Sequence, residues 1–359
     1  MKFKVVVLGA GVGRQHVTGY QSLPDHYEVY AVCDRDAVRA AELAATVSGC
    51  KIETDINAVL ADPCVDIVSN CLPPHLHAEV SMAALDAGKH VVSEKPIAGS
   101  IGEAERLLSV ARASGKRFVP VFQYRYGHSI AQLNALISCG LAGDPLVATL
   151  ETHWNRSADY YGVDWRGTWD GELGGAIVSH AIHGHDLLCD LFGEVTHVSA
   201  ALATKVNSIE TEDCAALILK TTNGGLATSS TTLGASDDRS RLRLVYRHIT
   251  VDSGHDPYAP GQDVWSFSAR DPANQASVDK VAERTKNSLA AIPQGFAGQF
   301  LAIAQHLNGR NSPMVTPEDG LRSIELATAI YLADRTGREI ALPLERHLPI
   351  CEGWALTHS

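Results

Sequence analysis

The sequence predicts an α/β domain with a doubly wound parallel sheet, followed by an α+β domain with an open, mainly antiparallel sheet. The chain has 359 residues, which suits two domains of about 150 residues, and 45% of its residues are hydrophobic, enough for two cores. Up to residue 122, strand and helix patterns alternate, which implies right-handed crossovers and a parallel sheet. Beyond residue 122, strands follow one another through tight turns, as in antiparallel hairpins. We therefore expect one domain in residues 1–122 and a second in residues 123–359.

The first domain is expected to begin with a short β-branched strand, a glycine-rich turn and a helix. The strand at 2–8 runs into Gly9-Ala10-Gly11-Val12-Gly13, and the helix after it ends before Pro24. Strands and helices then alternate to the end of the domain. Strands are expected at 28–33, 65–72, 90–93 and 118–122, and helices at 37–47, 78–87 and 101–113. The loops that follow these strands share the carboxyl edge of the sheet, where such folds bind ligands.

The second domain is expected to combine hairpins with a few helices. Strands are predicted at 146–154, 195–206, 214–221, 225–233, 242–246 and 248–252, and helices at 129–139, 179–192, 296–307 and 317–336. The stretch 254–294 has little periodicity, and we expect it to be a long excursion at a subunit contact or over the site.

Charge and cysteine content exclude several classes of protein. Thirty basic and 41 acidic residues give a net charge of −11, which repels nucleic acid and anionic lipid. We find no stretch of about 20 apolar residues that could span a membrane. The N-terminal apolar run passes into a glycine turn without a signal-peptide cleavage site. Eight cysteines without a CxxC pair suit a reducing compartment. We therefore expect a cytoplasmic protein without nucleic-acid or membrane partners.

The glycine-rich turn is a candidate dinucleotide site of the Rossmann type. Gly9, Gly11 and Gly13 lie between a strand and a helix, where a tight turn and a helix N-terminus can hold pyrophosphate. Their spacing is GxGxG, one residue shorter than the usual fingerprint, and Arg14 stands at the position of the third glycine. The context of the turn supports the site more than its spacing does.

The residue after the second strand favours NAD over NADP. The carboxylate of Asp34 can accept hydrogen bonds from both ribose hydroxyls and would repel a 2′-phosphate. Arg35 follows directly and could tolerate that phosphate, so NADP stays the less favoured alternative. A purely structural role for Asp34 is to cap the next helix.

Two further segments carry groups suited to proton transfer. Lys95, in Glu94-Lys95-Pro96, follows the strand at 90–93, where the nicotinamide end of a dinucleotide would lie; a lysine there can stabilise a developing alkoxide. In a helix from 179 onward, steps of 100° place Ser179, His183 and Asp186 on one face. A histidine beside a carboxylate is suited to taking a proton near neutral pH. The alternatives are a surface lysine in a turn and a helix of core histidines.

The histidines of this helix also raise the question of a metal site. His180 and His183 could share one ion, but His185 lies 200° around the helix from His183. We therefore expect no bound metal.

These residues together resemble the Gfo/Idh/MocA oxidoreductases, which act on sugars, cyclitols and related polyols. The resemblance covers essentially the whole chain, from the glycine turn through Leu72-Pro73-Pro74-His75-Leu76-His77 and the Glu94-Lys95-Pro96 tripeptide to the segment leading into His183 and Asp186. It implies a nicotinamide-binding Rossmann domain and then an open antiparallel sheet that commonly builds dimers or tetramers. It also implies that Lys95 positions and polarises the substrate and that His183 is the general acid/base.

The resemblance extends the set of expected ligand contacts. At the cofactor we expect, besides the three glycines and Asp34, the residues Pro73, His77 and Glu94; at the substrate we expect Arg125, Trp165, Arg166, Ser179 and His180. One departure affects the chemistry, because Ser179 stands where the family usually has Asp. A hydroxyl carries no charge, so His183 is expected to be a weaker base unless His180 and Asp186 compensate.

The predicted function is an inositol-dehydrogenase-like, NAD-dependent oxidation of a secondary hydroxyl in a sugar, sugar acid or cyclitol. The expected partners are this small-molecule substrate and further copies of the chain, as a homodimer or homotetramer formed through the open sheet. Two alternatives stay open. One is a redox-neutral glycoside hydrolase that uses NAD transiently, and the other is a non-catalytic NAD-sensing regulator. The presence of both Lys95 and His183 argues against the regulator.

Overall fold

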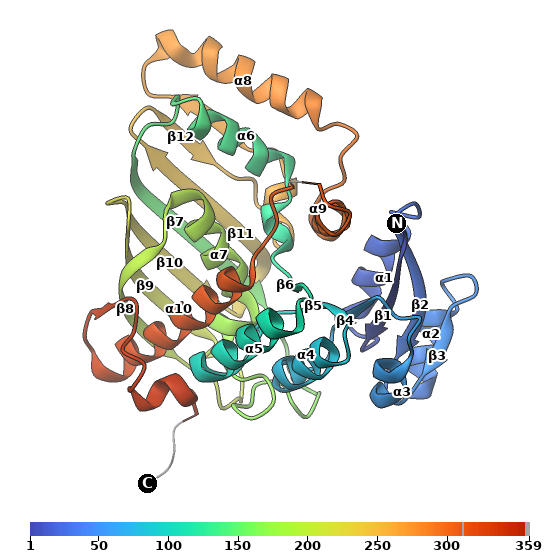
Figure 1. Cartoon of the computed structure of the whole chain (residues 1–359). Coiled ribbons are helices and arrows are strands. Elements are labelled where there is room, and N and C mark those ends of the chain that lie inside the picture. Colours follow the sequence, from blue (N-terminus) through green and yellow to red (C-terminus); the bar gives the residue numbers. More distant parts are fainter. Residues whose placement is uncertain (311, 356–359) are drawn as a thin grey trace. The chain divides into compact units, whose positions relative to one another are not determined.

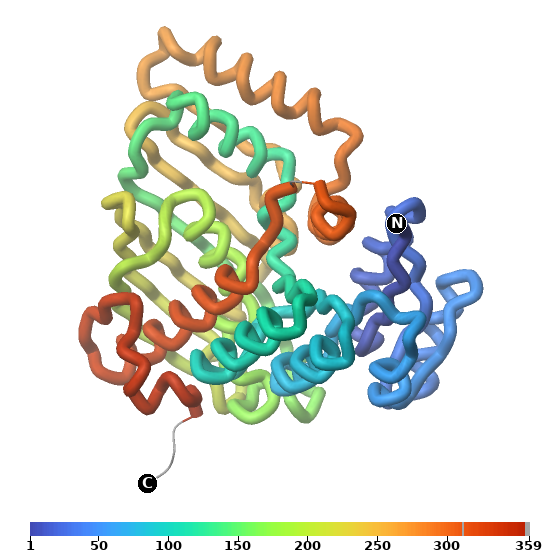
Figure 2. Tube along the Cα trace, in the orientation of Figure 1, coloured from blue at the N-terminus to red at the C-terminus, as the bar shows by residue number. Residues whose placement is uncertain are grey.

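The computed structural model of the chain describes residues 1–310 and 312–355 and divides the chain into two compact units (Figures 1 and 2). Unit 1 comprises Met1–Phe122 and Phe296–Ile324, and unit 2 comprises Gln123–Gly295 and Glu325–Ser359. The chain leaves unit 1 after Phe122, where the domain boundary was expected. The segment Phe296–Ile324, expected in the second domain, groups with unit 1 instead. Its phenylalanines Phe296 and Phe300 pack on the ring of His16, which explains the difference.

Unit 1 is built on a six-stranded sheet in the order β3-β2-β1-β4-β5-β6, with all neighbouring strands parallel. This is the doubly wound order, whose switch point lies between β1 and β4. The strands are β1 (Phe3–Leu8), β2 (Tyr27–Cys33), β3 (Lys51–Glu53), β4 (Ile67–Asn70), β5 (His90–Ser93) and β6 (Phe118–Pro120). The helices are α1 (Gly13–Gln21), α2 (Ala37–Ala44), α3 (Ile56–Ala61), α4 (His77–Asp86), α5 (Ile101–Ser114) and α9 (Gly295–Leu307), with a 3-10 turn at η1 (Pro74–Leu76).

The central strands form because their apolar, β-branched side chains are covered on both faces of the sheet. Val5, Val7 and Leu8 of β1 are fully buried, as parallel sheets require. The edge strand β3 and the short helix α3 were not predicted. Lys51 and Ile52 of β3 are exposed, so this strand lacks the apolar pattern that marks the others.

Unit 2 contains an eight-stranded sheet in the order β13-β12-β11-β7-β10-β9-β8-β14. Neighbours pair antiparallel except β7 and β10, which are parallel, so the predicted mainly antiparallel sheet is confirmed. Its strands are β7 (Pro145–Asn155), β8 (Val195–Ala203), β9 (Cys214–Thr221), β10 (Leu226–Thr232), β11 (Gly234–Tyr246), β12 (Ile249–Asp252), β13 (Ser266–Ala269) and β14 (Ile340–Ala341). The helices are α6 (His128–Ser138), the π-helix η3 (Ile177–Ala181), α7 (Ile182–Phe192) and α8 (Gln275–Ser288). Helix α10 (Pro317–Thr336) begins in unit 1 and ends in unit 2. Short 3-10 turns are η2 (Gln123–Arg125), η4 (Pro260–Gln262), η5 (Pro272–Asn274) and η6 (Pro349–Glu352).

The stretch 254–294, expected to be a long excursion with little periodicity, contains β13 and α8. The helix escaped prediction because only Val278 and Ala282 on it are buried, which leaves almost no apolar periodicity. It packs on α6, where the side-chain amide of Gln132 donates to the carbonyl of Ala282 over 2.9 Å (Figure 1).

The two faces of the unit 2 sheet differ. Helix α7 packs on β7 of one face, since a Cβ on Gly184 would touch the side chains of Leu150 and Thr152. Side chains of the opposite face are exposed, and Ile218 of β9 and Leu226 of β10 are 58% and 51% accessible. Exposed apolar side chains on a sheet face are a common mark of an interaction surface.

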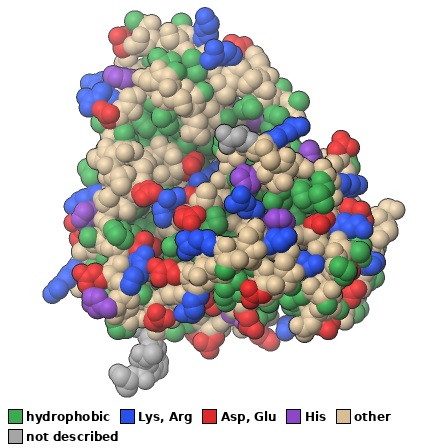
Figure 3. All heavy atoms as spheres, viewed as in Figure 1, with side chains coloured by type: hydrophobic (Ala, Val, Ile, Leu, Met, Phe, Trp, Pro, Cys, Tyr) green, Lys and Arg blue, Asp and Glu red, His purple; other side chains and the backbone are tan. Residues whose placement is uncertain are grey.

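Other surface and covalent features bear on the sequence-based expectations. Acidic and basic side chains are interspersed over the visible face in Figure 3. Within the described residues, no helix is long and apolar enough to cross a membrane. None of the eight cysteines forms a disulfide.

Candidate active site

The glycine turn of unit 1 has two glycines that packing requires and a third, Gly11, that has only a flexible side chain near it. Gly9 has a φ of +92°, and a Cβ there would lie 2.5 Å from the carbonyl oxygen of Cys71. A Cβ on Gly13 would lie 2.8 Å from a methyl carbon of Val7. On Gly11 it would meet only the Arg39 guanidinium, at 3.5 Å. Gly9 and Gly13 therefore shape the turn, and Gly11 leaves room for a ligand.

The surroundings of the turn fit a dinucleotide. Helix α1 starts without a side-chain cap at the glycine turn, where the positive end of its dipole favours an anion. The N–H groups of Arg14 and Gln15 already donate to the carbonyl oxygens of Gly11 (3.2 Å) and Val12 (2.9 Å). The carboxylate of Asp34 accepts hydrogen bonds from the backbone N–H groups of Ala10 (2.8 Å) and Asp36 (3.0 Å), which fixes it beside the turn. Asp36 caps α2, so that structural role does not fall to Asp34. NAD would find pyrophosphate contacts at the α1 N-terminus and a ribose acceptor at Asp34.

Lys95 lies in a loop at the carboxyl end of β5, and buried side chains hold this loop from two directions. Glu94 Oε1 is 3.1 Å from His16 Nε2, and Glu94 Oε2 accepts from the Lys95 backbone N–H at 3.2 Å. The ring of His77 lies between two carbonyl oxygens, those of Pro96 and Leu72, each 2.7 Å from a ring nitrogen. Burial of His77 lowers the pKa of its imidazole. The Lys95-Pro96 peptide is cis.

His77 and Glu94 therefore shape the loop around Lys95, whatever contacts they make to a cofactor. Contact with the cofactor, expected for both and for Pro73, stays a prediction. Sequence reasoning did not assign a role to His16, although its place one turn into α1 was visible.

In unit 2 the helix that carries His183 begins with a π-turn, which the sequence did not predict. Residues Ile177–Ala181 form the π-helix η3, and regular α-helix starts only at Ile182. A π-turn has more residues than the 3.6 of an α-helix, so the 100° steps used to place Ser179 on one face with His183 do not hold here. The hydroxyl of Ser179 donates to the carbonyl oxygen of Gly175 (2.7 Å) and lies 2.6 Å from Nδ1 of His180.

His183 and Asp186 are both buried and contact adjacent residues of one segment. The ring of His183 stacks on Tyr124 with centroids 4.7 Å apart and planes at 27°. The next residue, Arg125, donates two hydrogen bonds to the Asp186 carboxylate, at 2.8 and 2.6 Å, and one to Asp190 at 3.1 Å. Arg125, predicted to bind substrate, thus neutralises the carboxylate that was expected to support His183.

Three of the other predicted substrate residues share one aromatic cluster. The Tyr160 hydroxyl accepts a hydrogen bond from Arg166 and lies 3.4 Å from Nε2 of His180. The Arg166 guanidinium covers the rings of Tyr160 and Trp165, at 3.9 and 4.5 Å from their centroids. The ring of Trp154 meets His180 edge to face at 5.1 Å.

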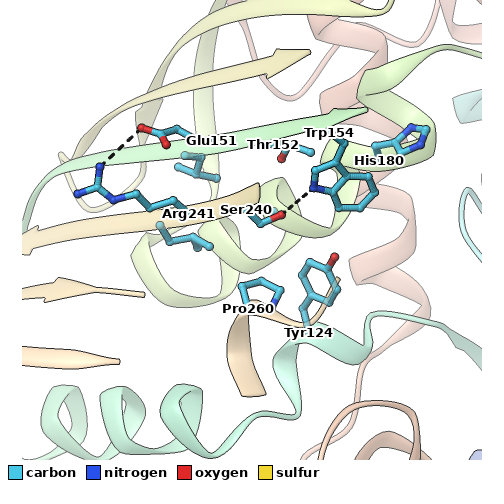
Figure 4. Close-up of a pocket in the computed structure, with 11 residues that line it drawn as sticks. Tyr124, Glu151, Thr152, Trp154, His180, Ser240, Arg241 and Pro260 are labelled. Carbon is cyan, nitrogen blue, oxygen red and sulfur yellow. Dashed lines mark hydrogen bonds and ion pairs between the residues drawn. The ribbon is translucent and has the colours of Figure 1, made fainter. Parts of the chain in front are cut away.

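A small pocket lies beside His180 in unit 2 (Figure 4). Figure 4 shows Trp154 and His180 at one end, Tyr124 and Pro260 below them, and Ser240 accepting from the Trp154 indole N–H over 3.1 Å. Tyr124 thus borders the pocket and also stacks on His183, which links the two groups of predicted residues.

A buried carboxyl group holds the start of the His183 helix. Glu212 accepts from the backbone N–H groups of Gly175 (3.2 Å) and Ile177 (3.0 Å) and from the Tyr331 hydroxyl at 3.1 Å. Burial raises its pKa to about 7. Sequence reasoning missed Glu212. The Gly174-Gly175 pair was a possible signal of this close contact, since a Cβ on Gly175 would lie 1.9 Å from the Glu212 carbonyl oxygen.

His185 faces away from this cluster, as its helical position indicated. Its Nε2 lies 2.9 Å from the Ser229 hydroxyl, and burial lowers its pKa to about 4. Among residues 1–310 and 312–355, no three His, Cys, Asp or Glu side chains gather as metal ligands would.

Comparison with known proteins places both parts of the chain. Residues 3–122 match the model described as oxidoreductase family, NAD-binding Rossmann fold, and residues 135–342 match the C-terminal alpha/beta domain of the same family. An uncharacterized oxidoreductase of Schizosaccharomyces pombe is 30% identical over 60% of this chain and 59% of its own length. The inositol 2-dehydrogenase of Salmonella typhimurium is 33% identical over 44% of this chain and 47% of its own length. The chain thus spans about 60% or less of the length of these two curated relatives.

The fold is also found in solved structures. The WlbA dehydrogenase from Bordetella pertussis, crystallised with NADH and UDP-GlcNAcA, is 26% identical. It superimposes with a TM-score of 0.84 over 96% of this chain and 99% of its own. With its Rossmann and C-terminal domains both matched, the chain belongs to the Gfo/Idh/MocA oxidoreductase family, and its N-terminal domain is an NAD-binding domain.

Proposed function

We propose that the protein is an NAD-dependent dehydrogenase that oxidises a secondary hydroxyl of a sugar or cyclitol. The observation that carries this proposal is Lys95, in a braced loop at the carboxyl end of β5 in an NAD-binding Rossmann domain. Ligands of doubly wound sheets bind at this edge. The names of the inositol 2-dehydrogenase and of WlbA bound to NADH and a nucleotide sugar support the polyol class.

The roles follow from the two side chains. His183 removes the hydroxyl proton, and Lys95 stabilises the oxygen as its negative charge develops. The glycine turn and Asp34 would hold NAD, which would supply the hydride acceptor for the carbinol carbon. The ring of Tyr124 stacks on the His183 imidazole, with the two planes 27° apart and the centroids separated by 4.7 Å, and so limits the orientation of the imidazole.

The charges in unit 2 favour a neutral polyol over a sugar acid. Three arginines of unit 2 have carboxylate partners: Arg125 binds Asp186 and Asp190, Arg156 binds Asp238, and Arg166 lies 3.5 Å from Glu172. A guanidinium paired in this way offers less net charge to a substrate anion. The Tyr160 and Trp154 rings would supply stacking surface for a sugar ring.

A spectrophotometric panel tests the proposal. Purified protein is mixed with NAD, and separately with NADP, and with inositols, neutral aldoses, glycosides and aldonates, while absorbance of the reduced cofactor is followed. We expect NADH to form with at least one neutral polyol, and NADPH to form more slowly when NADP replaces NAD. Chromatography of the products distinguishes the alternatives, because a redox-neutral hydrolase releases cleaved sugar without NADH. A protein that binds NADH and turns over nothing would be a sensor.

We also propose that copies of the chain associate through the exposed sheet face as a homodimer or homotetramer. Exposed Ile218 and Leu226 support this. Light scattering after gel filtration should give a multiple of the chain mass, and Ile218→Asp should reduce it to the monomer. A wild-type protein that elutes as a monomer contradicts the proposal.

The absence of disulfides suits the reducing cytoplasm.

A further inference from the structure

We propose that His16 is a positioning residue for Lys95: it holds the Glu94 carboxylate, and through it the backbone of the Lys95 loop. The inference rests on the proposed catalytic role of Lys95. His16 itself lies in the first turn of α1, just after the glycine turn, so it would join the cofactor-binding turn to the catalytic loop within unit 1.

The hydrogen bonds around His16 run in one direction. The Tyr20 hydroxyl donates to the oxygen of Ser69 at 3.1 Å, and that hydroxyl lies 2.8 Å from Nδ1 of His16. Since the Ser69 oxygen accepts from Tyr20, its own proton can go to Nδ1 of His16 at 2.8 Å or to the Cys71 sulfur at 4.0 Å, and the shorter contact favours Nδ1. Nε2 is then the protonated nitrogen, and it donates to Glu94 Oε1 at 3.1 Å. The other carboxylate oxygen accepts from the Lys95 N–H.

The setting of His16 makes these bonds strong and gives the ring little freedom. His16 is fully buried, and Phe296 and Phe300 of α9 pack on its ring with centroids 5.0 and 5.3 Å away. Hydrogen bonds in a water-free, apolar surrounding are stronger than exposed ones, and unpaired groups there are costly. The Glu94 carboxylate therefore has one favoured orientation, and the Lys95 backbone follows it.

The opposite side of the loop is held independently. His77 of α4 binds the carbonyl oxygen of Pro96, so Lys95 sits between two fixed backbone points, one set by α1 and one by α4. Loosening one of them should move the ammonium group relative to the substrate oxygen without unfolding the sheet. Displacements of about 1 Å at a reacting group are enough to lower a rate substantially.

Two substitutions separate positioning from packing. His16→Phe keeps a ring in the aromatic surroundings and removes both hydrogen bonds, whereas His16→Gln keeps an N–H donor near the position of Nε2. We expect His16→Phe to lower kcat about tenfold or more, with a smaller change in the polyol KM, and His16→Gln to recover most of it. Tyr27→Phe is the matched control, because it removes a buried hydrogen bond to the carbonyl oxygen of Phe300 nearby without touching His16, Ser69 or Glu94.

A double-mutant cycle tests whether His16 acts through Glu94. In a Glu94→Gln background, His16→Phe should cost little further activity, because the bond it breaks is already weakened. If the two losses multiply, or if Tyr27→Phe loses as much activity as His16→Phe, then His16 is only a core residue.

A second readout needs no turnover. Labelling of the Lys95 amine by acetic anhydride, measured by peptide mass spectrometry across pH, should change in His16→Phe and return toward wild type in His16→Gln. An unchanged Lys95 profile together with a lowered melting temperature overturns the inference. If the wild type oxidises no polyol, the labelling still decides the role of His16, while the dehydrogenase proposal fails separately.

Discussion

The loop of Lys95 and the helix of His183 are held by different kinds of contacts. Around Lys95, imidazole rings bind a carboxylate and backbone carbonyls in a fully buried setting. Around His183, carboxyl groups form the corresponding contacts: Glu212 binds the start of the helix, and Asp186 binds Arg125. The first arrangement depends on shape and hydrogen bonds, and the second on charge. We therefore expect these two groups of residues to respond differently to substitution, pH and salt.

The largest expected effect comes from removing the two proposed catalytic groups. Lys95→Ala should lower kcat by about a thousandfold, because it removes the charge beside the developing alkoxide. His183→Ala should lower it by about a hundredfold and recover in part at high pH, where solvent can take the proton. NADH affinity, measured by fluorescence titration, should stay nearly unchanged in both variants. Turnover equal to wild type in either one contradicts its assigned role.

Breaking the ion pair beside His183 should affect stability most. Arg125→Met leaves the buried Asp186 carboxylate without its guanidinium, which should cost about 3 kcal/mol in urea unfolding. The matched control is Arg243→Met, which breaks an exposed pair with Asp252 and should cost under about 1 kcal/mol. Equal losses would mean that burial does not strengthen the Arg125 pair.

Two glycine substitutions in the turn of unit 1 should separate an effect on folding stability from an effect on NADH binding. Gly9→Ala forces a positive φ on alanine against the Cys71 carbonyl and should cost about 2 kcal/mol of folding free energy. Gly11→Ala meets only a flexible guanidinium, so stability should hold while NADH affinity falls about tenfold. Unimpaired NADH binding in the folded Gly11→Ala variant would exclude this turn as the pyrophosphate site.

The smallest effect is a pair of opposite pH dependences in unit 2. The pKa of Glu212 is raised from 4.5 to about 7, so the folded state binds the extra proton and its contribution to stability is lost as pH rises through this range. The pKa of His185 is lowered from 6.5 to about 4, so its contribution is present above pH 6.5 and lost as pH falls. The melting temperature of each variant is compared with that of the wild type at the same pH. Between pH 5 and 7 this difference should rise by a few degrees for Glu212→Gln and fall by a few degrees for His185→Gln. The same slope in both variants would contradict these shifts.

The sequence predicted most of unit 1 because its signals are local. Lys95 closely follows the short strand β5, which contains two buried valines. In a parallel sheet every such strand end lies at one edge, so its place needed no long-range information. The short polar strand β3 was missed for lack of pattern. The sequence shows that His16 and His77 are present, but which oxygen atoms their rings bind depends on how α1 and α4 pack.

In unit 2 the sequence predicted the strands better than the site. The pairing of Arg125 with Asp186 joins residues 61 positions apart, and that of Glu212 with Tyr331 joins residues 119 apart. No periodicity reports such contacts. The fully regular helix assumed at 179 also failed, because nothing in the local pattern marks a π-turn.

The π-turn η3 gives the helix of His183 an adjustable element. It contains more backbone than an α-helical turn of the same rise, so deleting one residue from Ile177–Ala181 would let regular α-helix extend back from Ile182. Such a deletion would rotate everything before the turn by about 100° relative to α7. Relatives with and without this extra residue would then present different side chains beside the same histidine, a route to new substrates that needs no change in the histidine itself.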